Sequence, residues 1–174
     1  VILNLANYVK QNSNNLSKEF GKDQASLWIL SRIENLKLKV TTYLDSLEYH
    51  KALEEIKNFL LFDFSKTYIH FIREDLDDGK VQKVLHSVYL DAITLLAPFL
   101  PFLTEKINLD VYKKESIHLQ PWPKINKKLI NQELETAVNY SNEIIQGIMA
   151  ARDKAKIGVR WPLKKATVNL QKEK

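Results

Sequence analysis

Apolar side chains at helical spacing are the feature that most constrains how this chain can fold. One stripe runs from Val81 to Phe102 with an apolar residue every three or four positions, the period of an α-helix. Pro98 and Pro101 interrupt the stripe without changing its phase, so a kink or break is expected there. Phe99 and Phe102 at its end are assigned to the core. Only 4 of 174 residues are glycine and 5 are proline, which leaves few turns and argues against a β-sandwich or β-barrel.

Five helices are predicted from the same periodicity, and they are expected to form an antiparallel bundle, an all-α fold. They cover residues 1–11, 24–46, 49–75, 79–109 and 131–156. Asp23 suits the N-cap of the second helix, and an aspartate of Asp77-Asp78-Gly79 can cap the fourth. Residues 113–130 are expected to be a partly extended connection. Gly158 would suit a left-handed end of the fifth helix, and residues 165–171 alternate enough for a short strand.

Positive charge is concentrated at one end of the chain. The sequence holds 26 basic and 21 acidic side chains, a net charge of +5. Residues 1–143 carry 18 basic and 19 acidic side chains, whereas residues 144–174 carry 8 basic and 2 acidic ones. A localised basic segment is typical of a protein that binds a polyanion, and a solvated tail would have the same composition.

Two cations interrupt the apolar stripe of the last predicted helix. On a helical wheel Arg152 falls inside the apolar sector and Lys156 falls at its edge. They could reach past the core or form a buried ion pair, with Asp63 or another carboxylate, or they could face a ligand. The following loop adds Arg160, Trp161, Lys164 and Lys165. Cations interleaved with an aromatic ring suit RNA, because a guanidinium binds phosphate and an indole stacks on an unpaired base, although Trp161-Pro162 could equally be a packing anchor.

Neither a catalytic centre nor a metal site is predicted from the sequence. The absence of cysteine excludes a thiol nucleophile and a thiolate metal site. The four histidines show no metal-ligand spacing, His50 and His86 are expected at helix surfaces, and four scattered glycines cannot form a phosphate-binding loop. The most apolar segment, residues 90–103, is shorter than the roughly 20 residues of a membrane-spanning helix. No membrane partner is therefore expected.

Short motifs follow one another along the whole chain in a recognisable order. They are Trp28-Ile29-Leu30-Ser31-Arg32, Tyr49-His50-Lys51-Ala52-Leu53, Asp63-Phe64-Ser65 with Tyr68-Ile69 and Ile72-Arg73, Leu95-Leu96-Ala97-Pro98-Phe99-Leu100-Pro101-Phe102, and Ser116-Ile117-His118-Leu119 with Trp122-Pro123. This series resembles the helical anticodon-binding domain of class I aminoacyl-tRNA synthetases that act on isoleucine, valine or leucine. A last run resembles the isoleucyl-tRNA synthetases in particular, namely Ala150-Ala151-Arg152 with Lys154-Ala155, Ile157 and Val159-Arg160-Trp161-Pro162-Leu163.

The resemblance implies a module that binds the anticodon stem-loop of tRNA(Ile) and positions it for aminoacylation. Residues 1–158 would form the helical-bundle anticodon-binding domain, and residues 159–174 a connection into a further C-terminal region. The chain begins with Val1 and is expected to be a piece of a longer protein, whose catalytic domain would use ATP and magnesium in the cytoplasm. The motifs His-Ile-Gly-His and Lys-Met-Ser-Lys-Ser of that domain are absent, so this chain is not expected to activate isoleucine. The alternatives are the same module of a valyl or leucyl enzyme, or a non-enzymatic scaffold that binds other proteins.

Eight side chains are predicted to contact RNA, from the resemblance and the charge pattern together. They are Arg32, Arg73, Arg152, Lys156, Arg160, Trp161, Lys164 and Lys165. The last two lysines are expected to neutralise phosphates generally. Arg32 and Arg73 could instead form internal ion pairs that tie helices together. Thr67 stands where the family often has tryptophan, and Glu74-Asp75 replaces its usual Pro-Arg, so no specific contact is carried over at residues 67–75.

Overall fold

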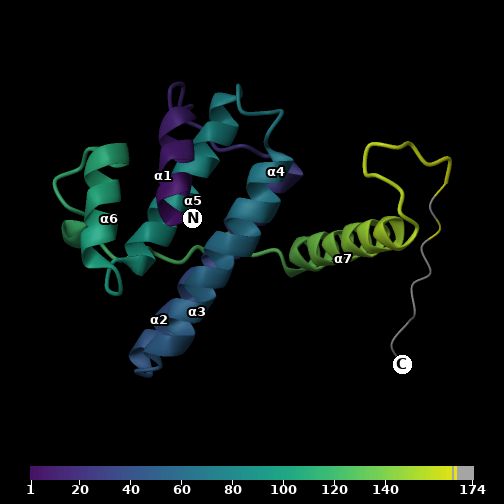
Figure 1. Ribbon diagram of the computed structural model, residues 1–174. Coiled ribbons are helices and arrows are strands. Elements are labelled where there is room, and N and C mark those ends of the chain that lie inside the picture. Colours follow the sequence, from purple (N-terminus) through teal and green to yellow (C-terminus); the bar gives the residue numbers. More distant parts are fainter. Residues whose placement is uncertain (166, 168–174) are drawn as a thin grey trace. The chain divides into compact units, whose positions relative to one another are not determined.

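The computed structural model describes residues 1–165 and 167, and these residues contain helices and connections without a strand (Figure 1). The predicted all-α fold is thereby confirmed. The chain divides into two compact units, Val1–Asn131 and Gln132–Lys174. The strand expected at residues 165–171 lies outside the described residues, apart from positions 165 and 167. Among the described residues, no helix has both the length and the apolar character needed to cross a membrane.

The first unit contains six α-helices, with a π-helical segment η1 between two of them. In chain order these are α1 (Ile2–Gln11), α2 (Gln24–Asp45), α3 (Tyr49–Asn58), η1 (Phe59–Tyr68), α4 (Ile69–Phe71), α5 (Gly79–Leu96) and α6 (Pro101–Ile107). The predicted caps are confirmed: the Asp23 carboxylate accepts a hydrogen bond from Ser26 N at 2.8 Å, and that of Asp78 accepts one from Lys80 N at 2.8 Å. A tight turn at residues 46–48 makes α2 and α3 antiparallel neighbours (Figure 1).

The helix predicted over residues 49–75 is one helical path with a wider middle. In η1 the backbone hydrogen bonds join residues five apart instead of four, and the side chains of Leu60, Phe64 and Tyr68 are buried. Phe64 stacks on Tyr89 of α5 with ring centroids 5.6 Å apart, and the Tyr89 hydroxyl donates to the Ile2 carbonyl at 2.9 Å. Tyr68 is also fully buried. These aromatic rings join η1, α5 and α1 into one core.

The break expected at the two prolines is confirmed, but the apolar stripe does not keep its phase across it. α5 ends at Leu96 and α6 begins at Pro101, and between them Leu100 has non-helical dihedral angles (φ −130°, ψ 62°). Phe102 is 92% exposed, so its assignment to the core is wrong, and Phe99 is only half-buried. The reason is that α6 starts with its own rotation about its axis and turns Thr104 and Ile107, not Phe102, toward the core.

The connection from α6 to α7 (Gln132–Lys154) is held along α2. It contains the short helical turns η2 (Asn108–Tyr112), η3 (Ile117–Leu119) and η4 (Lys127–Leu129). Hydrogen bonds that tie it to α2 include those of Trp122 Nε1 to Thr41 Oγ1 at 2.9 Å, Asn126 N to Glu34 Oε2 at 2.7 Å, and Asn131 N to Ser31 Oγ at 2.8 Å. The partly extended connection predicted for residues 113–130 therefore packs on the bundle by polar contacts.

A buried charge cluster links α2 to α5. Lys37 Nζ lies 2.9 Å from Glu34 Oε1 and 2.7 Å from Asp91 Oδ2. Burial alone would lower the pKa of the Lys37 ammonium, but the two carboxylates, Asp91 foremost, outweigh it and raise this pKa. The ammonium therefore stays charged and bridges the two helices.

Candidate nucleic-acid interface

The second unit ends its helix α7 with a chain reversal at Lys156. Ile157 N donates to Arg152 O at 3.0 Å and Lys156 N donates to Asp153 O at 2.9 Å, the paired bonds of a Schellman motif. The left-handed residue of this motif is Lys156, with φ 54°. The prediction that Gly158 would take this conformation is wrong: α7 ends at Lys154, so the left-handed position falls two residues before the glycine.

Arg152 turns its guanidinium into the loop that follows the helix. Its Nη2 donates to three main-chain carbonyls, those of Gly158, Val159 at 3.1 Å and Trp161 at 2.6 Å. Asp63, one partner suggested from sequence, is paired with Arg32 instead. Arg152 is half-buried and, from the last turn of α7, its side chain binds the loop, an arrangement that the helical wheel could not distinguish from the alternatives.

Trp161 lies over Gly158 and remains open to solvent. Trp161 N donates to Gly158 O at 3.0 Å, which closes a turn of four residues. A Cβ added at Gly158 would lie 3.3 Å from Trp161 Cδ1, so the indole packs directly on the glycine backbone. The side chain is nevertheless 72% exposed. An indole held in this way offers apolar ring surface for stacking.

Exposed cations surround this turn in sequence. Every basic residue from position 154 to 165 is exposed, namely Lys154, Lys156, Arg160, Lys164 and Lys165. The only acidic residue in the same stretch of residues 152–165 is Asp153. Several positive charges around one exposed aromatic ring can attract a phosphate backbone and stack a base at the same place.

In the first unit, Arg32 forms an ion pair. Its Nε and Nη2 both donate to Asp63 Oδ2, at 3.1 and 2.7 Å, which ties α2 to η1. Arg73, just after α4, is exposed. Burial raises the pKa of the Tyr8 hydroxyl, and the Arg73 charge opposes this rise, which places Arg73 near the α1 tyrosine.

Comparison with known proteins settles the family. The family described as "Anticodon-binding domain of tRNA ligase" matches residues 26–167, most of this chain. The chain belongs to this family. The matched range includes α2 from Ser26 onward and the turn that carries Trp161.

Similar proteins carry one enzyme name. The anticodon-binding domain is 35% identical over 159 residues to the isoleucine–tRNA ligase of Methanosarcina barkeri. This match covers 84% of the present chain and 15% of the relative. It is 31% identical over 180 residues to the isoleucine–tRNA ligase of Pyrococcus furiosus, covering 97% of this chain and 17% of the relative. The chain thus spans about one sixth of the length of these relatives.

The residues predicted to contact RNA fall into both units of the anticodon-binding domain. Arg32 and Arg73 lie in the first unit, and the other six lie in the second. Within the second unit, the Arg152 bonds bring the helix end and the Trp161 turn together. Sequence reasoning overlooked Lys154, an exposed cation at the end of α7, although it lies inside the motif that contains Arg152.

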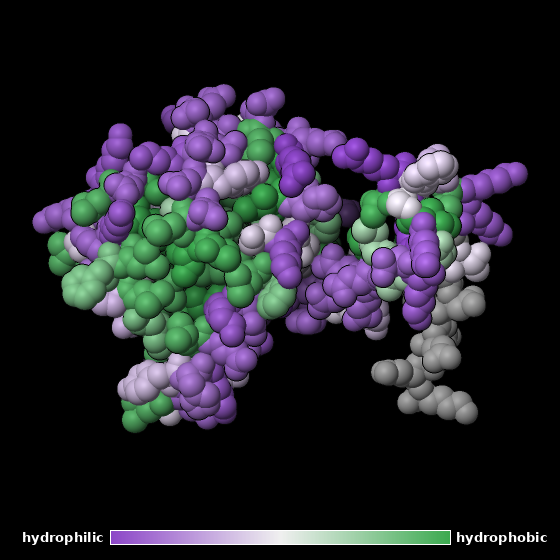
Figure 2. Space-filling view, in the orientation of Figure 1, coloured by the Kyte–Doolittle hydropathy of each residue, from purple (hydrophilic) through white to green (hydrophobic). Residues whose placement is uncertain are grey.

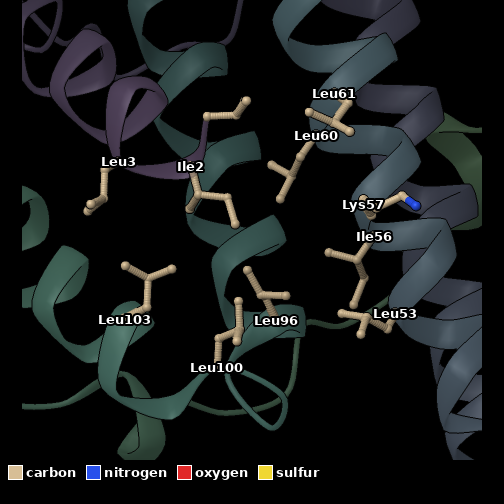
Figure 3. Close-up of a pocket in the computed structure, with 11 residues that line it drawn as sticks. Ile2, Leu3, Leu53, Ile56, Lys57, Leu60, Leu61, Leu96, Leu100 and Leu103 are labelled. Carbon is tan, nitrogen blue, oxygen red and sulfur yellow. The ribbon is translucent and has the colours of Figure 1, made fainter.

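The first unit contains an apolar groove, in contrast to the exposed cations of the second unit (Figure 3). Figure 2 shows apolar side chains gathered over the face of this unit that carries α1, α5 and α6. The groove encloses about 480 Å³ and is lined by side chains such as Leu53, Leu60, Leu96 and Leu103, with Lys57 as its one charged residue (Figure 3). A groove of this composition does not suit a polyanion.

The described residues do not fit the cofactors that the family resemblance implies for the parent enzyme. Within residues 1–165 and 167, no group of three His, Asp or Glu side chains could hold a metal ion. The four glycines stand singly at positions 21, 79, 147 and 158, so no glycine-rich loop is present to bind triphosphate. No chemical step with ATP or magnesium is assigned to these residues.

Proposed function

We propose that this domain binds the anticodon stem-loop of tRNA(Ile) as part of an isoleucine–tRNA ligase. The observation that carries the proposal is the exposed Trp161 indole amid exposed cations at the end of α7, inside the range that the family matches. The names of the relatives support isoleucine as the amino acid of the parent enzyme. That enzyme would use ATP and magnesium, in a catalytic domain outside this chain, and would act in the cytoplasm.

Within this site, phosphate contacts and base contacts have different sources. Lys156, Arg160, Lys164 and Lys165 are exposed cations that would bind the RNA backbone and set its position. Trp161 would stack on an unpaired base of the anticodon loop. Arg73 is exposed and is proposed as a further phosphate contact. The ion pair with Asp63 supports the structural role for Arg32, so we propose that it maintains the fold around α2 rather than binding RNA.

We also propose how the chain fits into its parent enzyme. Residues 1–158 would act as the anticodon-binding domain, and residues 159–174 would lead toward a further C-terminal region. The catalytic and C-terminal domains of the same parent chain would then be its protein partners. The length of the relatives supports this, since about five sixths of each lies outside the matched range.

Titration of the chain with RNA at several salt concentrations tests the proposed function. The RNAs are transcripts of tRNA(Ile), tRNA(Val), tRNA(Leu) and an unrelated tRNA. If about three to five phosphates are neutralised, affinity should fall roughly 20- to 500-fold between 50 and 200 mM salt. Tighter binding of tRNA(Ile) than of the others is expected.

Each other outcome of this titration contradicts a stated part of the proposal. Preference for tRNA(Val) or tRNA(Leu) would reassign the module to a valyl or leucyl enzyme. Equal binding of all transcripts would remove specificity for the anticodon. Failure to bind any tRNA even at low salt would favour the scaffold function.

A further inference from the structure

Arg152 closes the loop after α7 from both of its ends. Its carbonyl accepts the Ile157 amide at 3.0 Å, where the chain reverses. Its Nη2 donates to the carbonyls of Val159 and Trp161, at 3.1 and 2.6 Å, and to that of Gly158. One residue thus fixes the main chain from position 157 to position 161.

The bonds of Arg152 also decide which groups the loop turns outward. The carbonyl oxygens of residues 158, 159 and 161 point at the guanidinium, so their negative ends are directed away from an approaching phosphate. Among the described residues no carboxylate pairs with Arg152, so its positive charge remains uncompensated. Both effects make the loop more attractive to a polyanion.

The guanidinium is poorly placed to hold a phosphate by a two-pronged contact, because either form of that contact needs Nη2. The two hydrogens of Nη2 are directed at three carbonyl oxygens, and a phosphate would have to displace them. Arg152 Nε is buried and has no hydrogen-bond partner among the described residues. A phosphate therefore cannot form the two-pronged contact that arginine usually makes without opening the loop.

We propose that Arg152 is a positioning residue of the RNA site, which holds residues 157–161 so that the Trp161 indole is presented to an unpaired base. This inference rests on the proposed function and assigns Arg152 a role other than phosphate contact. Gly158 supports the same arrangement, because the indole packs on its backbone where a Cβ would lie 3.3 Å from the ring. The ligand of this loop is a single-stranded RNA base whose flanking phosphates meet the exposed lysines.

A first experiment examines the loop without RNA. The chain is labelled with 5-fluorotryptophan, and the resonances of Trp28, Trp122 and Trp161 are compared between wild type, Arg152→Gln and Lys154→Gln. Lys154→Gln is the matched control, since it removes one positive charge from the same helix end but no loop contact. The Trp161 resonance should shift in Arg152→Gln only. If it stays unchanged in Arg152→Gln, the positioning role is wrong, whether or not the chain binds tRNA.

A second experiment measures tRNA(Ile) affinity as a function of salt. Trp161→Ala should weaken binding roughly 5- to 150-fold, the range for loss of one stacked base. Arg152→Gln should weaken binding within the same range, and the double variant Arg152→Gln/Trp161→Ala should be little worse than Trp161→Ala. The salt dependence should change no more in Arg152→Gln than in Lys154→Gln. Arg152→Lys, which keeps the charge and can still donate to carbonyls, should recover part of the affinity.

Two outcomes of the second experiment separate failure of the inference from failure of the proposed function. Independent effects of the Arg152 and Trp161 substitutions, with a larger change in salt dependence for Arg152→Gln than for Lys154→Gln, would make Arg152 a direct phosphate contact and overturn the positioning role. Failure of wild type to bind any tRNA would overturn the proposed function, and the fluorine spectra would then still decide whether Arg152 shapes the loop.

Discussion

Arg32 and Asp63 form an ion pair in which Nε and Nη2 of the guanidinium share one carboxylate oxygen, at 3.1 and 2.7 Å. The side chains are 28% and 18% exposed, so the charges are only partly screened by water. The pair joins α2 to η1, 31 residues apart in sequence, at the place where the helix widens. Arg32 therefore has a structural task that does not require RNA.

Removing the Asp63 charge should destabilise the fold. We expect Asp63→Asn to lower the free energy of unfolding by about 1–3 kcal/mol, since a charge-assisted hydrogen bond is lost and Arg32 is left without this partner. Urea denaturation measures the change, and Asp45→Asn at the exposed end of α2 is the control, expected within about 0.5 kcal/mol of wild type.

The RNA affinity of the Arg32 variant decides between its two roles. Arg32→Gln should destabilise the chain like Asp63→Asn and leave tRNA affinity within about twofold at a temperature where both variants are folded. A tenfold loss of affinity in Arg32→Gln, absent from Asp63→Asn, would show that Arg32 contacts RNA.

Truncation should lower stability strongly at one phenylalanine and hardly at all at another. Phe64 is fully buried against Tyr89, so Phe64→Ala should cost about 3–5 kcal/mol in urea denaturation. Phe102 is 92% exposed, and Phe102→Ala should change stability by less than about 0.5 kcal/mol. A large loss for Phe102→Ala would return this side chain to the core, where the sequence pattern had placed it.

The break between α5 and α6 shows which parts of this fold apolar periodicity can predict and which it cannot. Apolar spacing predicts the helices and the break at Pro98 and Pro101, because these depend on local chemistry. It cannot predict how α6 is rotated, since four residues outside a helix erase the phase relation on which the pattern depends. Nor does it predict the π-helical η1, where a change in the hydrogen-bonding step leaves the residue types looking α-helical.

His86 should make stability depend on pH. Burial, followed by the charges of Lys83 and Lys114, lowers the pKa of His86 to about 4. The ordinary value is about 6.5, so between pH 6.5 and pH 4 the unfolded chain binds a proton that the folded chain does not, and stability falls as pH decreases through this window. Over this pH range the titration of His86 should lower the unfolding free energy of wild type by about 1–3 kcal/mol.

Comparison with His86→Phe isolates this contribution, because carboxylates also titrate in part of that range. Phenylalanine retains an aromatic ring beside Tyr112, which contacts His86 at 4.5 Å between ring centroids. As pH falls from 7 to 4.5, the unfolding free energy of wild type should decrease relative to that of the variant. Parallel curves would contradict a lowered pKa at His86.

The Lys37 ammonium should be essential to the α2–α5 contact. Lys37→Met leaves the Glu34 and Asp91 carboxylates without their shared cation, and should cost about 3–5 kcal/mol at pH 7. The cost should be smaller at pH 5, since burial raises the pKa of the Asp91 carboxyl, and without the Lys37 charge this group takes up a proton more readily in the folded state than in the unfolded chain. Urea denaturation at both pH values measures this. Lys39→Met, which removes an exposed ion pair with Glu55, should cost less than about 1 kcal/mol.

The loop after α7 was predictable in composition and not in geometry. Its charge, its aromatic residue and its motif can all be read from the sequence, and the helical wheel correctly singles out Arg152 as unusual. The partners of the Arg152 guanidinium are the main-chain carbonyls of residues 158, 159 and 161. Because every residue type supplies such a carbonyl, no pattern of side chains could reveal them. The left-handed turn at Lys156 is equally hidden, because it occurs at a lysine although a glycine stands two residues later.

Lys164 and Lys165 should contribute to RNA affinity through charge alone. Both are exposed, and as phosphate neutralisers they would bind without reading the base sequence. Lys164→Gln/Lys165→Gln should weaken binding by a similar factor for every tRNA and should make the slope of log affinity against log salt shallower by roughly 1.4–1.8. Titrations from 50 to 200 mM salt measure the slope, and Lys113→Gln/Lys114→Gln in the first unit is the charge-matched control. A selective loss for tRNA(Ile), with an unchanged slope, would instead make these lysines part of the recognition of the anticodon loop.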